Sequence, residues 1–325
     1  MDMKDTAVLQ VCDLHVDFAG AGRSVPVVRG LSYTLKAGRV LAVVGESGSG
    51  KTVQALSLLG LLPPVARISG GRVLYQEKDL VTLPEEQLRE VRGQKISMIF
   101  QDPAASLNPV LTVGEQLCET LRAHRAISRQ QARKQAVNLL REVGIAEAEK
   151  RLDEYPFQFS GGMCQRVMIA MALALSPDVL IADEPTTALD VTIQAQILRL
   201  IKNLQQASHM AVIFITHNLA LASQIADEVL VLYGGLCMEQ APAAALFAHP
   251  LHPYTQGLLA SLVSVRSKVK RLPAIAGQPP VAGEVPSGCP FAPRCPYTTE
   301  KCRRSLPPLQ HREERWVRCW REEQV

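Results

Sequence analysis

The residues best suited to chemistry form a glycine-rich octapeptide, GESGSGKT, which lies between an apolar run and a segment of helical character. It fits the pattern G-x-x-x-x-G-K-[ST], in which glycines let backbone amides point at phosphate oxygens and a helix start adds positive charge. Lys51 would place its ammonium on the β- and γ-phosphates, and the Thr52 hydroxyl would be a ligand of Mg²⁺. A plain glycine-rich turn is the alternative. The residues expected to bind the nucleotide here are Gly45, Ser47, Gly48, Ser49, Gly50, Lys51 and Thr52.

Two adjacent carboxylates follow another apolar run, Val179–Ala182. Such a strand lies beside the phosphate-binding loop in P-loop folds, so Asp183 would reach the Mg²⁺ through its ligand shell. Glu184 would polarise an attacking water, because a carboxylate beside the γ-phosphate can accept the developing proton. Acidic residues favoured by the dipole at a helix start are the alternative.

A histidine, His217, directly follows the apolar run Val212–Thr216. Ligands of open α/β sheets gather at the carboxyl ends of the strands, so a neutral imidazole there could donate to the γ-phosphate. A histidine with a purely structural role is the alternative. Its place at a strand end favours a phosphate sensor.

Strands and helices alternate along the part of the chain that must position these residues. Alternating apolar residues predict antiparallel strands at Val8–Phe18 and Leu31–Leu35. Four apolar runs are typical of strands buried on both faces of a sheet: Val40–Val44, Ile96–Phe100, Val179–Ala182 and Val212–Thr216. This alternation favours an α/β fold with a mostly parallel sheet.

Helices are indicated by caps and apolar stripes. Thr52–Leu62 has helical character, and Ser128 with Gln131 forms a capping box before a helix that Gly144 can end. One amphipathic helix has an apolar stripe made of Ile193, Ile197, Leu200, Ile201 and Leu204. We expect a largely helical insert at about 102–175, and a domain boundary at about Leu262, where Pro, Gly and basic residues become frequent.

The composition of the 325-residue chain is that of a globular protein, with 47% hydrophobic and 20% charged residues, which excludes wholesale disorder and collagen-like or coiled-coil composition. A net charge of +4 argues against a protein that coats polyanions. The N-terminus alternates polar with apolar residues, which predicts a strand rather than a cleavable signal. No stretch approaches the ~18–20 apolar residues that span a bilayer. We expect a soluble, cytosolic chain with reduced thiols.

Four cysteines crowd the last 37 residues with the spacing C-x5-C-x6-C-x16-C: Cys289, Cys295, Cys302 and Cys319. Four thiolates in a segment too small for a core of its own suggest a module stapled by a metal. Zinc sites usually have C-x2-4-C pairs and bacterial ferredoxins have C-x2-C runs, and this segment has neither. On the residues alone, zinc, a [4Fe–4S] cluster and unliganded thiols all stay open.

The octapeptide FSGGMCQR, Phe159–Arg166, resembles the signature of the ABC-transporter ATPases. Met163 stands where that signature more often has glutamine, a variant familiar in one branch of the family. The remaining motifs of the family occur in the family's order: the P-loop, Gln101 as the Q-loop, the signature, Asp183-Glu184 as Walker B, Ala188-Leu189-Asp190 as the D-loop, and His217 as the switch histidine.

Three longer strings resemble one group of this family, the ATPases of dipeptide, oligopeptide and nickel importers, with the dipeptide type most similar. They are Met98–Leu117, Ile181–Ile197 and His249–Leu259. The resemblance implies a RecA-like, mostly parallel core sheet, an N-terminal antiparallel β subdomain, a helical subdomain at about 102–175 and a small cysteine-rich C-terminal extension. It places the ATPase domain at 7–260 and the extension at 261–325.

The resemblance also implies roles for single residues. Glu184, His217 and Gln101 would act in catalysis, and Thr52, Gln101 and Asp183 would hold Mg²⁺. Phe18 would stack on the adenine, although a core phenylalanine is the alternative. The partner subunit's ATP would be capped by the Ser160 hydroxyl and the Gly161 and Gly162 amides, in a head-to-tail dimer that ATP closes and hydrolysis opens. The remaining residues expected at this ATP are Met163 and Asp190.

The family further implies partner proteins and a location in the cell. We expect a second ATPase subunit, a homologous sister chain, two membrane permease subunits and, indirectly, an extracytoplasmic binding protein, with the chain peripheral at the cytoplasmic face of the inner membrane. Its cofactors would be ATP, Mg²⁺ and, in the four-cysteine segment, a [4Fe–4S] cluster, with Zn²⁺ as the alternative.

Other functions stay open but are less favoured. The cargo could be nickel, a metallophore or glutathione in place of peptides. A non-transport ABC ATPase that acts on nucleic acid or the ribosome is disfavoured. DNA-repair types insert long coiled coils between P-loop and signature, whereas here Lys51 and Ser160 are only 109 positions apart and the segment between them has no sustained heptads. Translation-factor types have two ATPase domains in one chain, and this chain has one. Glu184 and His217 together disfavour a module that binds ATP only to assemble a complex.

Overall fold

The computed structural model describes residues 6–20, 24–187, 189–261, 275–280, 286–312 and 314–321. The chain divides into two compact units. The first unit consists of residues 1–8, 36–39 and 83–213, and the second of residues 9–35, 40–82 and 214–325. The domain boundary expected at about Leu262 lies outside the described residues.

The first unit holds a short parallel sheet. β6 (Ile96–Ile99) pairs in parallel with β7 (Val179–Asp183), and the first half of β8 (Ala211–Thr216) also belongs to this unit. Every residue of these three strands is buried, as the apolar runs predicted for β7 and β8. The predicted run Ile96–Phe100 is buried only as far as Ile99, where β6 ends, and Phe100 is 40% exposed.

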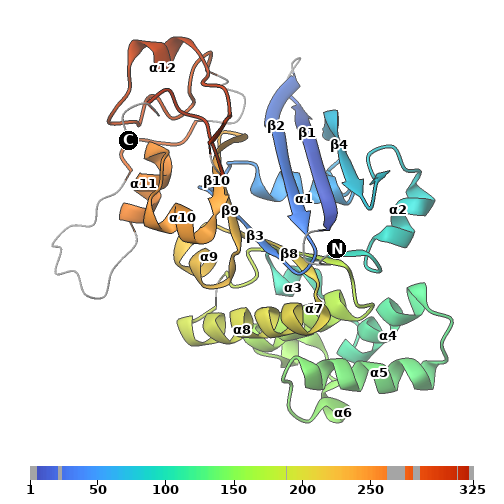
Figure 1. The fold of residues 1–325 in the computed structure, drawn as a ribbon. Helices are drawn as coiled ribbons and strands as arrows, with labels where there is room; N and C mark the ends of the chain where they lie inside the picture. The colour runs from blue at the N-terminus through green and yellow to red at the C-terminus, as the bar shows by residue number, and fades with distance from the viewer. Residues whose placement is uncertain are drawn as a thin grey trace. The chain divides into compact units, whose positions relative to one another are not determined.

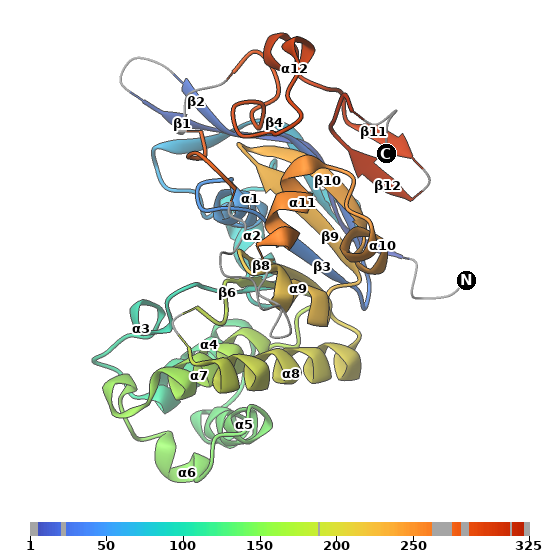
Figure 2. The same ribbon diagram turned by 90° about the vertical axis from the view of Figure 1, so that its left-hand side faces the viewer.

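Helices make up most of the first unit. They are α2 (Glu85–Val91), α3 (Pro103–Ser106), α4 (Val113–His124), α5 (Arg129–Glu142), α6 (Ala148–Arg151), α7 (Gly161–Leu173) and α8 (Val191–Ser208), with a short 3-10 turn at Pro156–Gln158. α4, α5 and α7 pack against one another (Figures 1 and 2). The predicted capping box is confirmed, since Ser128 Oγ accepts from the Gln131 amide and the Gln131 side chain accepts from the Ser128 amide. Such a cap stabilises a helix by about 1 kcal/mol.

The second unit contains an antiparallel sheet in the order β2-β1-β4-β5. Its strands are β1 (Ala7–Ala19), β2 (Ser24–Lys36), β4 (Ala66–Tyr75) and β5 (Lys78–Asp79). β1 and β4 pair in an irregular register near Asp13, where Gly71 is needed: a Cβ there would lie 2.3 Å from the Asp13 carbonyl oxygen. The two predicted N-terminal strands are confirmed, and the second is longer than its alternation indicated.

The second unit also holds strands in the order β11-β12-β10-β9-β3. β3 (Val40–Val44) runs parallel to β9 (Glu228–Tyr233), whereas β10 (Leu236–Pro242), β12 (Arg315–Val317) and β11 (Gln310–Arg312) continue antiparallel (Figure 2). Its helices are α1 (Lys51–Leu58), α9 (Leu219–Ile225), α10 (Ala243–Ala248), α11 (Pro253–Ala260) and α12 (Glu300–Arg304). α1 is shorter than predicted, because the chain turns at Gly60, whose φ is 61°, before it reaches the two prolines.

The cysteine-rich segment shares the core of the second unit. Phe291 is 2% exposed, and its ring centroid lies 5.4 Å from that of Tyr233 and 5.3 Å from that of Tyr254. Cys289 and Ala292 belong to the same apolar cluster as residues of β3, β9 and α10. A segment too small for a core of its own therefore obtains one by packing on the core of the second unit and adding two strands to its sheet.

No helix in the described ranges combines the length and the apolar character that a membrane crossing requires.

Candidate nucleotide-binding site

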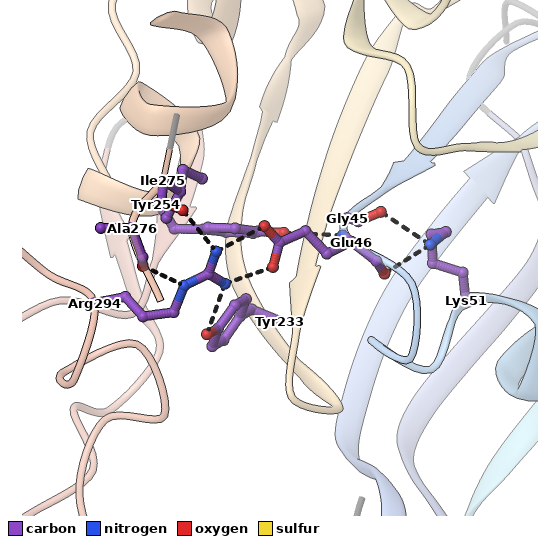
Figure 3. Close-up of polar contacts among 8 residues, drawn as sticks. All are labelled: Gly45, Glu46, Lys51, Tyr233, Tyr254, Ile275, Ala276 and Arg294. Carbon is purple, nitrogen blue, oxygen red and sulfur yellow. Dashed lines mark hydrogen bonds and ion pairs between the residues drawn. The ribbon is translucent and has the colours of Figure 1, made fainter. Parts of the chain in front are cut away.

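The glycine-rich octapeptide forms a closed loop between β3 and α1 in the second unit. The Lys51 side chain folds back over this P-loop, and its Nζ donates to the carbonyl oxygens of Gly45 and Glu46, both at 2.9 Å (Figure 3). Lys51 is only 6% exposed, so its charge is fixed in place within the loop. A fixed ammonium of this kind suits a phosphate, because little freedom is lost when the anion arrives.

Two glycines are required by the path of this loop. A Cβ at Gly45 would lie 2.3 Å from the carbonyl oxygen of Leu232 in β9, and Gly50 adopts a φ of 99°, a conformation that side chains disfavour, directly before α1. The loop can therefore lie close against β9 and still turn its amides towards the start of the helix, where anions bind favourably.

The hydroxyl of Ser49 gives a test of whether the loop fits a phosphate. Its Oγ is buried and finds no hydrogen-bond partner within the described parts of the chain. An unpaired buried hydroxyl costs about 1–3 kcal/mol, which a phosphate oxygen would recover. Ser47, Gly48 and Thr52 are exposed at the same loop and accessible to a ligand. The loop thus fits the predicted triphosphate.

The predicted catalytic carboxylate lies in the first unit, at the carboxyl end of β7. Glu184 has a φ of 46°, and its Oε2 accepts from Gln101 Nε2 at 3.2 Å and from Thr187 Oγ1 at 2.9 Å. Gln101 follows β6, and β6 and β7 are parallel neighbours, so their carboxyl ends bring the two side chains together. Asp183, the last residue of β7, is 1% exposed. The predicted trio of Gln101, Asp183 and Glu184 is therefore gathered at one edge of this sheet.

The signature begins α7, also in the first unit. Ser160 is the N-cap of α7, and its Oγ accepts from the Met163 amide at 3.3 Å. A Cβ at Gly162 would lie 3.1 Å from a methyl carbon of Ile193, whose amide is in turn capped by Asp190 at 3.0 Å. Ser160 and Gly161 are exposed, so the amides at this helix start are accessible to an anion. Ala188, the first residue of the D-loop, lies outside the described residues.

Two further predicted residues belong to the second unit. His217 is exposed directly after β8, and the next residue, Asn218, caps α9. Phe18 is half-buried in β1 opposite Ala66 of β4. A cavity of about 380 Å³ opens next to it, and its lining residues are Ala19, Gly20, Ser24, Pro64, Val65, Ala66 and Arg67. Adenine stacking on Phe18 stays a prediction.

Three residues at the P-loop were missed by sequence reasoning. Glu46 occupies a variable position of the motif, yet its amide donates to the Tyr254 hydroxyl at 2.9 Å and its carboxylate pairs with Arg294 (Figure 3). Arg294 lies 248 positions from Glu46, and nothing in its own neighbourhood, a proline- and cysteine-rich stretch, points to a nucleotide site.

The predicted four-cysteine metal centre is not found. No group of three or more His, Cys, Asp or Glu side chains among the described residues, which include all four of these cysteines, is placed to hold a metal ion. Cys289 is buried beside Phe291, and burial, with a smaller effect of the neighbouring cysteines Cys319, Cys302 and Cys295, raises the pKa of its thiol to about 11. The environment of Cys289 in this structure therefore favours the neutral thiol.

Comparison with known proteins agrees with these motifs. Residues 28–187 match the family model described as ABC transporter, and residues 238–302 match that described as oligopeptide/dipeptide transporter, C-terminal region. The first match includes the P-loop, Gln101, the signature and Asp183-Glu184, and the second includes Arg294 and three of the four C-terminal cysteines.

The chain is also similar to relatives over nearly their whole length. The chain is 49% identical over 319 residues to the dipeptide transport ATP-binding protein DppD of Bacillus subtilis, which covers 98% of this chain and 95% of the relative. It is 48% identical over 303 residues to the oligopeptide transport ATP-binding protein OppD of Salmonella typhimurium, covering 93% and 90%. Among solved structures, the ATP-binding cassette MJ0796, a dimer in a post-hydrolysis state bound to ADP and Pi, has a TM-score of 0.66 at 26% identity and covers 72% of this chain and 98% of that chain. This likeness confirms the predicted fold.

Proposed function

Because the chain belongs to the ATP-binding subunits of ABC transporters for dipeptides and oligopeptides, we propose that it is the energy-coupling ATPase of a di- and oligopeptide importer. One observation carries this proposal: a single chain joins the ABC ATPase region to the C-terminal region of peptide transporters, over nearly the full length of its relatives. The P-loop and the Gln101–Glu184 pair support the hydrolytic part of the proposal.

The P-loop binds the triphosphate in this proposal. Lys51 neutralises the β- and γ-phosphates from the position that the Gly45 and Glu46 carbonyl oxygens give it, and the Ser49 hydroxyl donates to a phosphate oxygen. Thr52, Gln101 and Asp183 would hold Mg²⁺, which neutralises phosphate charge when bound; their oxygen atoms are the ligands that this ion prefers. Phe18 stacks on the adenine.

Glu184 accepts a proton from the attacking water. The two hydrogen bonds from Gln101 and Thr187 fix the direction of its carboxylate, and a fixed base makes proton transfer more efficient. His217 donates a hydrogen bond to the γ-phosphate, and thereby reports whether that phosphate is present.

Transport requires a second ATPase subunit. The exposed start of α7, with Ser160, Gly161 and Gly162, binds the γ-phosphate held by the partner's P-loop, and Met163 and Asp190 complete that half-site. ATP therefore closes the head-to-tail dimer and hydrolysis opens it. The MJ0796 cassette was solved as a dimer, which supports this arrangement. The partner is a homologous sister chain, and the pair drives two permease subunits at the cytoplasmic face of the inner membrane, with an extracytoplasmic binding protein selecting the peptide.

The [4Fe–4S] cluster, with zinc as its alternative, stays a prediction that rests on the cysteine spacing and the resemblance. Among the described residues, no group of side chains is placed to hold such a metal. Iron and acid-labile sulfide analysis on anaerobically purified protein tests it. Zinc at one per chain without iron would replace the cluster, and absence of both would leave the cysteines as thiols.

Peptide import is tested by reconstitution. The chain, its sister subunit and the permease pair are placed in liposomes with the binding protein, and ATP hydrolysis is measured with and without a dipeptide. We expect the peptide-loaded binding protein to raise the hydrolysis rate several-fold. Stimulation by Ni²⁺ or glutathione in place of peptides would contradict the proposed cargo.

A further inference from the structure

Glu46 is held at all three of its polar groups. Its amide donates to the Tyr254 hydroxyl at 2.9 Å, and its carbonyl oxygen accepts from Lys51 Nζ at 2.9 Å. Its carboxylate accepts from Arg294 Nη1 at 2.5 Å and from Nη2 at 3.0 Å (Figure 3). Two parallel bonds from one guanidinium make the last contact both strong and directional. The second residue of the P-loop is therefore fixed from the C-terminal part of the chain.

Arg294 is itself held in one orientation. Its Nε donates to the Ala276 carbonyl oxygen at 3.0 Å, Nη2 also donates to that of Ile275 at 3.4 Å, and Nη1 also donates to the Tyr233 hydroxyl at 3.1 Å. The Arg294 side chain is 5% exposed and that of Glu46 is 26% exposed. Its hydrogen bonds to Glu46 and Tyr233 hold the pKa of Arg294 above its ordinary value. This ion pair is thus much less screened than an ordinary surface pair.

The same segment also lies against the turn between β9 and β10, which contacts the P-loop. A Cβ at Gly234 would lie 3.3 Å from Pro290 Cβ, and the next residue, Gly235, donates its amide to the Ser49 carbonyl oxygen at 3.2 Å. Ser49 is the residue whose buried hydroxyl lacks a partner in the described chain. The C-terminal segment therefore packs against the β9–β10 turn, and that turn itself contacts Ser49 of the phosphate-binding loop.

A carboxylate in a loop that binds a triphosphate carries an electrostatic cost. An ionised Glu46 repels the incoming phosphates, and the repulsion is larger where water is excluded. Arg294 neutralises this charge and also fixes the backbone that positions Lys51. Loss of Arg294 would leave the loop with an unpaired negative charge and a less constrained second residue.

We propose that Arg294 is a positioning residue for the P-loop, through which the cysteine-rich C-terminal segment sets the affinity for ATP. This inference rests on the proposed function, since it concerns the same nucleotide site. It assigns the segment a role in nucleotide binding that does not depend on its cysteines or on any metal.

The test compares Arg294→Met with Arg304→Met in the full chain. Arg304 lies in the same segment, but it pairs with Glu300 on an exposed face of α12. The readouts are the Kd for ATP, KM and kcat for hydrolysis, and Tm. We expect Arg294→Met to raise Kd and KM about tenfold with kcat within about twofold, and Arg304→Met to change none of them. Arg294→Lys should recover part of the affinity, because a lysine keeps the charge but not the two parallel bonds.

A double variant separates positioning from a merely structural role. In the Arg294→Met background, Glu46→Gln should tighten ATP binding, because it removes the unpaired charge. In the wild-type background the same substitution should tighten ATP binding less or weaken it, because it also disrupts the two parallel bonds from Arg294 that position the loop. A lower Tm for Arg294→Met with an unchanged Kd would overturn the inference. If Arg294→Met does not fold, Arg294→Lys carries the test, and an unchanged Kd there would overturn it. A wild-type chain that binds no ATP would contradict the proposed function itself.

Discussion

In the first unit, Glu184 is held by Gln101 from the neighbouring strand end and by Thr187 from its own turn, whereas in the second unit Glu46 is held by Arg294 from 248 positions away. The first arrangement follows from two parallel strands that end side by side. The second exists only because a C-terminal segment packs on the ATPase core. Hydrolysis and nucleotide binding therefore depend on different parts of the chain, and substitutions should affect one without the other.

The largest effect should come from the core that the C-terminal segment shares with the second unit. Phe291→Ala should lower the free energy of unfolding by about 3–5 kcal/mol, because it leaves a cavity beside the rings of Tyr233 and Tyr254. Phe157→Ala, which truncates a 75% exposed ring in the first unit, is the matched control and should have little effect. Denaturant unfolding measures both. A loss below about 1 kcal/mol for Phe291→Ala would mean that the segment is not part of this core.

The second-largest effect should come from removal of the Lys51 ammonium from the P-loop. Lys51→Ala should weaken ATP binding by about 10–150-fold, since a charge-assisted hydrogen bond contributes about 1.5–3 kcal/mol. Lys134→Ala, on the exposed face of α5, should leave the Kd unchanged. Calorimetric titration with ATP measures both constants. Equal constants for the wild type and Lys51→Ala would place the triphosphate elsewhere.

A smaller effect, on kcat, is expected from the loss of one hydrogen bond that orients the Glu184 carboxylate. Thr187→Val removes one of two hydrogen bonds to its carboxylate, so kcat should fall about fivefold while the Kd for ATP stays constant, because one such bond contributes about 1 kcal/mol. Thr120→Val, which removes a bond to the Gln116 carbonyl within α4, serves as the control. A changed Kd with an unchanged kcat would mean that Thr187 acts in nucleotide binding and not in hydrolysis, which would contradict this division.

The smallest effect is a change in how stability depends on pH. Burial lowers the pKa of His252 to about 3, against about 6.5 in the unfolded chain, so the unfolded state binds more protons between these values. Stability is therefore lost as pH falls from about 6.5 towards 3. Burial raises the pKa of nearby Glu239, and this shift stabilises the folded state as pH falls, the opposite of the effect of His252. Glu239 is present in both the wild type and a variant at His252, so it does not affect their comparison.

His252→Asn removes this titration and keeps an acceptor for the Tyr254 amide, which His252 Nδ1 now caps. Unfolding free energies measured at pH 7 and pH 4.5 should differ less in this variant than in the wild type. An equal difference would mean that another group is responsible for the acid sensitivity of the second unit.

The features predictable from the sequence were those encoded locally. The buried strands β3, β6, β7 and β8 follow from uninterrupted apolar runs, and the Ser128–Gln131 capping box follows from two residue types three positions apart. The meeting of Gln101 with Glu184 could be expected once both were assigned to strand ends.

What escaped prediction depends on packing between distant segments. Glu46 and Arg294 are ordinary charged residues in sequence, and only the folding of the C-terminal segment onto β9 and α11 brings them together. The cysteine spacing pointed to a metal because the segment is too small for a core, but Phe291 supplies that core by packing on Tyr233 and Tyr254.

The most direct measurement is single-turnover hydrolysis of ATP by Glu184→Gln, alongside equilibrium binding of ATP to the same protein. The amide keeps an acceptor for Gln101 and Thr187 but cannot take a proton from water. We expect hydrolysis to fall by at least about 100-fold, in line with the loss of a general base, while the Kd for ATP stays within about threefold of wild type. Hydrolysis at near wild-type rates would contradict the role of Glu184 as the base of this ATPase.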